Sequence, residues 1–227
     1  MPLPNGLVNW SFSVLEMFEN CEYKYWAVKV GKIVSDDNQY NIDGDDEHKT
    51  FANYLTKRTP LPPRCQIYQP ILDKVLSSPG QLYVEYNMTL DYNYVPCKGT
   101  DWDRAWVRGA ADVLIVDGGL ATYIDWKTGK FRPKEAQLKL TAPLVFRHFP
   151  AVQEFRGVLF FHREQRMTDP LVIARSEEND MWNQFLPTVN AIAKARSTGE
   201  YRKKPNPLCA YCPVKSCEHW KPSPPKR

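Results

Sequence analysis

Residues 106–129 read WVRGAADVLIVDGGLATYIDWKTG, two apolar runs on either side of the turn Asp117–Gly119. Two glycines between alternating apolar segments indicate a tight β-hairpin. If these glycines form a two-residue loop, Asp112 lies directly opposite Asp125, with Cβ atoms about 4.5–5.5 Å apart on one face. Lys127, two residues beyond Asp125, shares that face. The hairpin therefore predicts a cluster of two carboxylates and one lysine.

This cluster has two interpretations, a divalent metal site or an ordinary surface ion pair. Opposed carboxylates repel each other, and a hard divalent cation such as Mg²⁺, which prefers oxygen ligands, removes the repulsion. A bound metal stabilises a phosphoryl transition state, and the lysine can orient or deprotonate a water. The alternative is a surface ion pair between Asp125 and Lys127, with Asp112 an ordinary strand-end acid. A one-residue shift of the turn would break the pairing.

The rest of the chain alternates helical and strand-like periods. An α/β fold with a central mixed sheet flanked by helices follows from this order. The predicted elements are a helix from Ser13, with Glu16 in a capping box, to about Val30; a polar loop over 35–47; helices at 45–57 and 67–76; strands at 82–90, 106–116, 120–127 and 155–161; and helices at 133–146 and 178–195.

Composition and charge narrow the class of protein. The chain has 227 residues, 43% of them hydrophobic, and no apolar run long enough to cross a bilayer. This length fits one domain over 1–227. Its first residues lack the pattern of a secretory signal, so we expect the protein in the cytoplasm, without a membrane partner. Eight Lys/Arg against two Glu follow from Arg196 onward. This basic segment suits a polyanion such as nucleic acid, although a solvated tail has the same composition.

Several short motifs together resemble a known family. They are Gly109-x-x-Asp112, Asp125-x-Lys127-x-Gly129, Trp10 to Ser13 leading to Cys21 and Tyr25, Gly44-x-x-x-His48, Gln137, and Cys209-x-x-Cys212-x-x-x-x-Cys217. Their order resembles that of PD-(D/E)XK nucleases, which have a restriction-endonuclease-like core. More narrowly it is similar to the RecB/AddB-type exonucleases, which include CRISPR-associated iron–sulfur exonucleases and phage exonucleases.

The resemblance implies roles for individual residues. His48, Asp112 and Asp125, helped by the Trp126 carbonyl, would bind Mg²⁺ or Mn²⁺, and Lys127 would serve the attacking water. Gln137 and Glu85 are secondary candidates. Residue 141 departs from the family pattern, because threonine stands where tyrosine is usual. His48 also shares a helical face with Phe51 and Leu55, so it is alternatively a core histidine, and Glu85 is alternatively a solvated side chain.

Three cysteines within nine residues, Cys209, Cys212 and Cys217, indicate metal, because disulfides are unusual inside cells. By the resemblance, Cys21 is the fourth ligand of a 4Fe–4S cluster. His219 is the rival ligand and would favour Zn²⁺, leaving Cys21 as a small buried apolar residue. The segment 200–227 is expected to pack on the first helix.

The implied activity is that of a DNA exonuclease in recombination, repair or phage DNA processing. Its substrate would be single-stranded DNA or DNA with free ends, and its partners a helicase or recombination protein, in a prokaryotic or phage-infected cell. An endonuclease of the same fold and a non-catalytic DNA-binding subunit are the alternatives. Trp102, Trp106 and Trp126 would either stack on bases or pack in the core.

Overall fold

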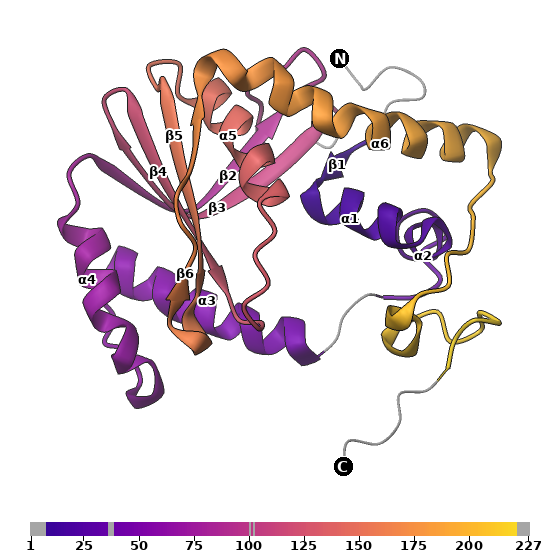
Figure 1. The fold of residues 1–227 in the computed structure, drawn as a ribbon, viewed down its shortest axis with the longest axis horizontal. Coiled ribbons are helices and arrows are strands. Elements are labelled where there is room, and N and C mark those ends of the chain that lie inside the picture. Colours follow the sequence, from indigo (N-terminus) through magenta and orange to yellow (C-terminus); the bar gives the residue numbers. More distant parts are fainter. Residues whose placement is uncertain (1–7, 36–38, 100, 102, 222–227) are drawn as a thin grey trace.

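A seven-stranded mixed sheet carries helices on both faces (Figure 1). The structure, a computed structural model, describes residues 8–35, 39–99, 101 and 103–221, with only the backbone of 39–45. The elements in chain order are β1 Trp10–Ser11, α1 Phe12–Asn20, α2 Glu22–Tyr25, η1 Trp26–Val30, α3 Gln39–Lys57, η2 Pro63–Tyr68, α4 Gln69–Ser77, β2 Gln81–Leu90, β3 Val107–Asp117, β4 Leu120–Lys127, α5 Ala136–His148, β5 Glu154–Phe161, η3 His162–Glu164, β6 Arg166–Met167, β7 Leu171–Ala174, η4 Arg175–Glu177, α6 Glu178–Thr198 and η5 Pro207–Tyr211.

The β3–β4 hairpin has the register that the two glycines predict. Asp117 faces Leu120, and the ladder continues to Val113 opposite Ile124. On its other side β3 pairs antiparallel with β2, while β4 pairs parallel with β5. Strands β6 and β7 pair antiparallel with β5. The expected central mixed sheet flanked by helices is confirmed.

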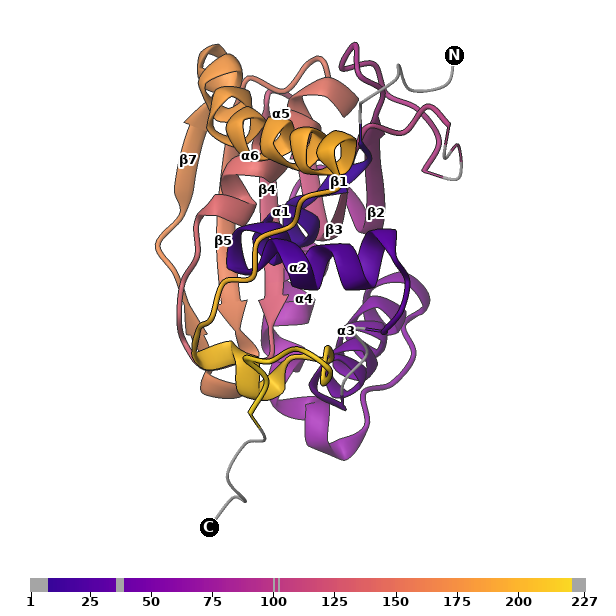
Figure 2. The same cartoon turned by 90° about the vertical axis from the view of Figure 1, so that its right-hand side faces the viewer.

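Each face of the sheet has its own apolar core. The larger core joins the sheet to α1, α5 and α6 and includes Trp10, Tyr123 and Phe155. The smaller core joins the opposite face to α3 and α4 and includes Phe51 and Trp126. Figure 2 shows the two helical layers on either side of the strands. Within the described ranges, no helix has both the length and the apolarity needed to cross a bilayer.

The first predicted helix is wrong in its continuity and its cap. Ser11, not Ser13, caps α1, by accepting a hydrogen bond from the Val14 N–H. The helix then breaks at Cys21, whose φ of −166° is extended, and resumes as α2 and the π-helical turn η1. The polar loop predicted over 35–47 is also wrong in part, because α3 begins at Gln39. The short strands β1, β6 and β7 were not predicted.

The C-terminal segment lies against the first two helices (Figure 2). The Tyr23 N–H donates to the Arg202 carbonyl, and the Arg202 guanidinium forms an ion pair with buried Glu22 at 2.9 Å. Lys204 and Asn206 donate to carbonyl groups at the end of α1. Burial opposes the charge of Glu22, but the hydrogen bonds from Arg202 outweigh it and lower the Glu22 pKa. These contacts hold the segment beside Cys21.

Candidate active site

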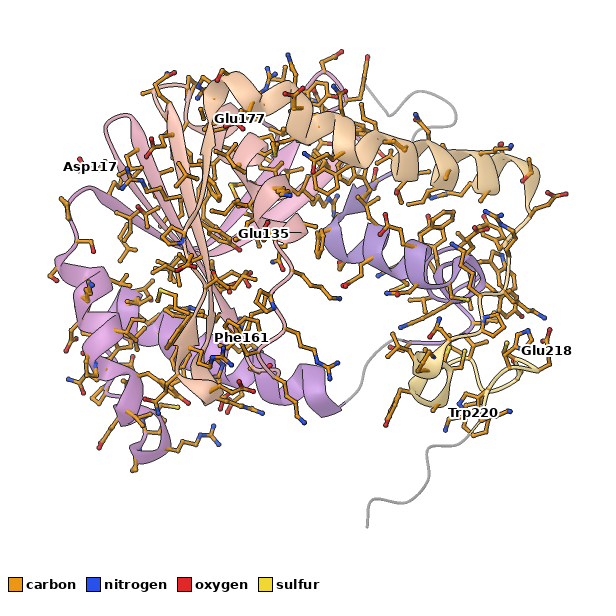
Figure 3. The ribbon with its side chains drawn as sticks, viewed as in Figure 1. Asp117, Glu135, Phe161, Glu177, Glu218 and Trp220 are labelled. Atoms are coloured by element: carbon orange, nitrogen blue, oxygen red, sulfur yellow. The ribbon has the colours of Figure 1, made fainter. Side chains whose placement is uncertain are left out.

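The site lies where β3 and β4 diverge. Their ladder ends at Val113 and Ile124, and farther along β3 the short strand β1 takes the place of β4, pairing parallel with Val107. Asp112 is the first residue of β3 past the ladder. Phe161, the register partner of Lys127, lies at this end of the sheet, away from the hairpin tip at Asp117 (Figure 3).

Strand alternation breaks on both sides of Asp112. In a regular strand Ala111 and Leu114 would face opposite sides, yet both belong to the larger core. The neighbouring strand β2 has the same break, since Tyr83 and Tyr86 both pack on that core. Glu85 lies between them, where the register steps from the pair Val84–Val113 to the pair Tyr86–Ala111, and it has a left-handed φ of +51°. Such a conformation is costly for a non-glycine residue and is often found at functional sites.

Asp112 is the centre of a group of possible metal ligands. Its Oδ2 atom accepts a hydrogen bond of 2.8 Å from the Trp126 N–H and lies 3.7 Å from His48 Nδ1. One ligand atom each from His48, Glu85 and Asp112 fall within 4.8 Å of one another. Burial, followed by the charge of Asp125, raises the pKa of Asp112 to about 8. A cation at this point would relieve that electrostatic penalty.

Asp125 is buried and held by three neighbours. Its Oδ1 atom accepts hydrogen bonds from the Tyr123 hydroxyl at 2.8 Å and from Gln137 Nε2 at 2.7 Å. Its Oδ2 atom lies 2.6 Å from Lys127 Nζ. Lys127 also donates to Gln137 Oε1 at 2.7 Å, which ties the lysine to α5. Asp125, Lys127 and Gln137 thus form a closed ring of polar contacts.

His48 comes from α3, on the other face of the sheet from α5. The preceding residue, Glu47, accepts hydrogen bonds from the Arg163 guanidinium at 2.9 and 3.1 Å and lies 3.5 Å from His162 Nε2. His162 is fully buried and makes T-shaped ring contacts with Phe51 and Tyr68, and this burial lowers its pKa to about 4. These contacts fasten the His48 turn to the end of β5.

The structure brings the predicted residues together in two adjoining groups. One is His48, Asp112 and Glu85, and the other is Asp125, Lys127 and Gln137. The Trp126 indole is buried against Phe51 and Phe160, and Trp106 is buried in the larger core, whereas Trp102 lies outside the described residues. Thr141 donates to the Gln137 carbonyl and stands next to the Tyr123 hydroxyl.

Sequence reasoning missed Tyr123. It lies two residues before Asp125, so it shares the Asp125 face of β4, and that spacing was the available signal. Nothing in the chain sequence shows which helix covers this face. Gly109 marks that covering helix, because a Cβ at this position would lie 2.5 Å from Leu144 of α5. This close approach brings α5, and with it Gln137, down onto the strands.

The cysteine end of the molecule contains a cavity of about 270 Å³. Its lining includes Cys21, Cys209, Cys212, Cys217 and His219. Among the described residues, no three of these side chains bring ligand atoms within 4.8 Å of one another, so the cysteines do not form a compact metal-binding group. Cys209 Sγ accepts a hydrogen bond of 3.3 Å from the Asn206 N–H. Burial raises the pKa of Cys212, and nearby Cys21 and Cys209 act in the same direction.

Comparison with known proteins matches more than half of the chain to one family. A family model for the PD-(D/E)XK nuclease superfamily matches residues 71–217, more than half of the chain, including Asp112 to Lys127 but not His48 or Cys21. A crystal structure named "Putative exonuclease", from Eubacterium rectale, superposes with a TM-score of 0.50 at 11% identity, covering 92% of this chain and 86% of that one. The crystal structure of SSO0001 gives 0.40 at 13% identity, covering 97% and 90%. No curated protein matches.

Proposed function

The chain belongs to the PD-(D/E)XK nuclease superfamily, and from this membership we propose that it is a metal-dependent deoxyribonuclease acting as an exonuclease. The observation that carries the proposal is the fork between β3 and β4. Two acidic side chains and a lysine, Asp112, Asp125 and Lys127, meet there at the open end of the sheet. The fold likeness to the Eubacterium rectale structure is compatible with this reading.

The donor atoms suit Mg²⁺ or Mn²⁺. Carboxylate oxygens with one imidazole form a ligand set that these cations accept. We assign His48, Asp112 and Glu85 to the cation, together with Asp125 Oδ2 and the Trp126 carbonyl. The raised pKa of Asp112 supports the assignment, because a buried carboxylate beside a second one lacks a compensating positive charge. When bound, the cation would stabilise negative charge on the phosphate and acidify a water.

The protein residues would place the reacting groups around the scissile phosphate. Lys127 is held by Gln137 and Asp125, so its ammonium group stands at the fork. From there it would orient the attacking water and stabilise the negative charge that develops on the phosphate oxygens. Asp125 would hold this lysine in place. The Glu47–Arg163 contacts would hold His48 toward Asp112.

For the cysteines we propose a 4Fe–4S cluster bound by Cys21, Cys209, Cys212 and Cys217. Tetrahedral zinc, with Zn–S bonds of about 2.3 Å, would draw its sulfurs to within roughly 4 Å of one another. The four cysteines line one cavity of about 270 Å³, and the N–H···S bond to Cys209 is of the kind that surrounds iron–sulfur ligands. The cluster would staple the tail to α1. Anaerobically purified protein should be brown and contain iron; a colourless protein with stoichiometric zinc, held with His219, would overturn it.

The exonuclease proposal is tested with linear and circular DNA. Linear single- and double-stranded DNA, labelled at the 5′ or 3′ end, should be degraded with Mg²⁺ or Mn²⁺, while covalently closed circles should remain intact. Cutting of the circles would instead establish an endonuclease of the same fold. If Asp125→Ala degraded DNA as fast as the parent, the site assignment would fail. No degradation of any substrate would favour a non-catalytic DNA-binding subunit. A helicase or recombination protein would supply unwound ends.

A further inference from the structure

Tyr123 is a buried polar group that the proposed mechanism does not use. Its side chain is fully buried in the larger core, where its ring packs against Phe155. A phenylalanine would fill this apolar position without the cost of burying a hydroxyl. The hydroxyl donates to Asp125 Oδ1 at 2.8 Å, so its proton is directed to a carboxylate of the site.

The two oxygens of Asp125 have different neighbours. Oδ1 accepts from Tyr123 and from Gln137, which satisfies that oxygen on the side of α5. Oδ2 has no hydrogen-bond donor of good geometry among the described residues and lies 2.6 Å from the Lys127 ammonium. The two hydrogen bonds that orient the Asp125 carboxylate therefore both end at Oδ1. The other oxygen, Oδ2, lies beside the Lys127 ammonium.

We infer that Tyr123 is a positioning residue, which holds Asp125 through Oδ1 so that Oδ2 is presented to the cation. This inference rests on the proposed function, since it assigns Oδ2 of the same site to the metal. Tyr123 itself does not touch the cation or the DNA. Loss of its hydroxyl would let the carboxylate rotate, and the cation would then bind to a less ordered ligand.

A purely structural role makes a different prediction. If the hydroxyl only satisfied a buried carboxylate, its removal would lower the melting temperature and leave metal affinity unchanged. If it positions Oδ2, the metal affinity falls as well. Loss of a group that orients a metal ligand typically weakens affinity or activity about 10–100-fold.

The test compares Tyr123→Phe with the full-length parent. Mn²⁺ binding is measured by calorimetry without DNA, and the half-saturating Mn²⁺ concentration is measured separately in a cleavage assay. We expect both to rise by about tenfold or more, with KM for DNA unchanged. Tyr86→Phe is the matched control, because Tyr86 packs on the same core but its hydroxyl contacts His148 instead. That variant should match the parent.

Each result bears on the inference. Unchanged Mn²⁺ affinity in folded Tyr123→Phe would overturn it. If Tyr123→Phe did not fold, Gln137→Ala removes the other donor to Oδ1 from a half-buried helix position, and unchanged Mn²⁺ affinity there would likewise overturn it. Failure of the proposed function is a separate result. A parent protein that binds Mn²⁺ but does not cleave DNA would refute the nuclease proposal, while the calorimetric comparison would still decide the role of Tyr123.

Discussion

The main-chain N–H of Trp126 donates a hydrogen bond of 2.8 Å to the Asp112 carboxylate. It links β3 to β4 beyond their last ladder pair, Val113 and Ile124, from two residues past Ile124 to one residue past Val113. A backbone donor thereby holds the carboxylate at the fork, beside Asp125. The link is favourable for a charged Asp112, but it does not offset burial and the neighbouring negative charges, so the pKa of Asp112 stays near 8.

This raised pKa predicts a loss of stability as pH rises from about 4 to about 8. A carboxyl group whose folded pKa is raised contributes stability that is fully present below its unfolded pKa, near 4, and is lost as pH rises through about 8. In EDTA, the free energy of unfolding should therefore fall across this window. The fall is expected to be on the order of a few kcal/mol, and Asp112→Asn should flatten it. The same substitution should abolish cleavage. Urea titrations at several pH values measure it, and an equal slope in both proteins would contradict it.

The lowered pKa of His162 predicts the opposite pH dependence, a loss of stability in acid. Its folded pKa is lowered to about 4 by burial, so stability is present above the unfolded pKa of about 6.5 and is lost as pH falls toward 4. His162→Leu should flatten this acid limb, because it removes the buried imidazole and fills a similar volume. Tyr68→Phe, a change in the same pocket, should keep the limb. Thermal melts from pH 7 to pH 4 give the comparison, and an unaltered acid limb in His162→Leu would refute the explanation.

The hairpin was predictable from sequence because its register is local. Two glycines set the loop, and the side-chain period of two then fixed which residues share a face through Val113. The strand beginning at Leu120 ends at Lys127, as the apolar pattern predicted. Local turn chemistry and alternation were sufficient there.

The remaining features depend on tertiary contacts. The break at Cys21 coincides with the return of the tail, where Arg202 bonds to Tyr23 and to Glu22, which is 180 residues away in sequence. Glu85 has the polarity of an ordinary exposed strand residue, and only the loss of alternation opposite Asp112 turns it toward the site. Tyr123 acquires a role because α5 places Gln137 beside the same carboxylate oxygen. No periodicity carries this information.

A substitution of Lys127 tests its proposed role in orienting the attacking water. Lys127→Met keeps most of the side-chain volume and removes the charge from Asp125 Oδ2. Loss of a group that orients or deprotonates water costs about 10²–10⁴-fold in rate, so kcat should fall by that order. Mn²⁺ affinity should be retained or increased, because the lysine no longer competes for Oδ2. Lys130→Met, an exposed lysine of the following loop, is the control and should keep kcat. Full activity in Lys127→Met would refute the role.

Two substitutions of Glu85 separate the cost of its backbone conformation from its contribution to metal binding. Its left-handed φ of +51° costs about 1–2 kcal/mol in a residue with a Cβ, and glycine adopts it freely. Glu85→Gly should therefore stabilise the metal-free protein by about 1 kcal/mol in urea unfolding, yet weaken Mn²⁺ binding because a carboxylate is lost near His48 and Asp112. Glu85→Gln keeps the backbone strain and should weaken Mn²⁺ binding without the gain in stability that comes from relieving it. Two variants with equal stability would show that the conformation carries no cost, and unchanged Mn²⁺ affinity in both would remove Glu85 from the site.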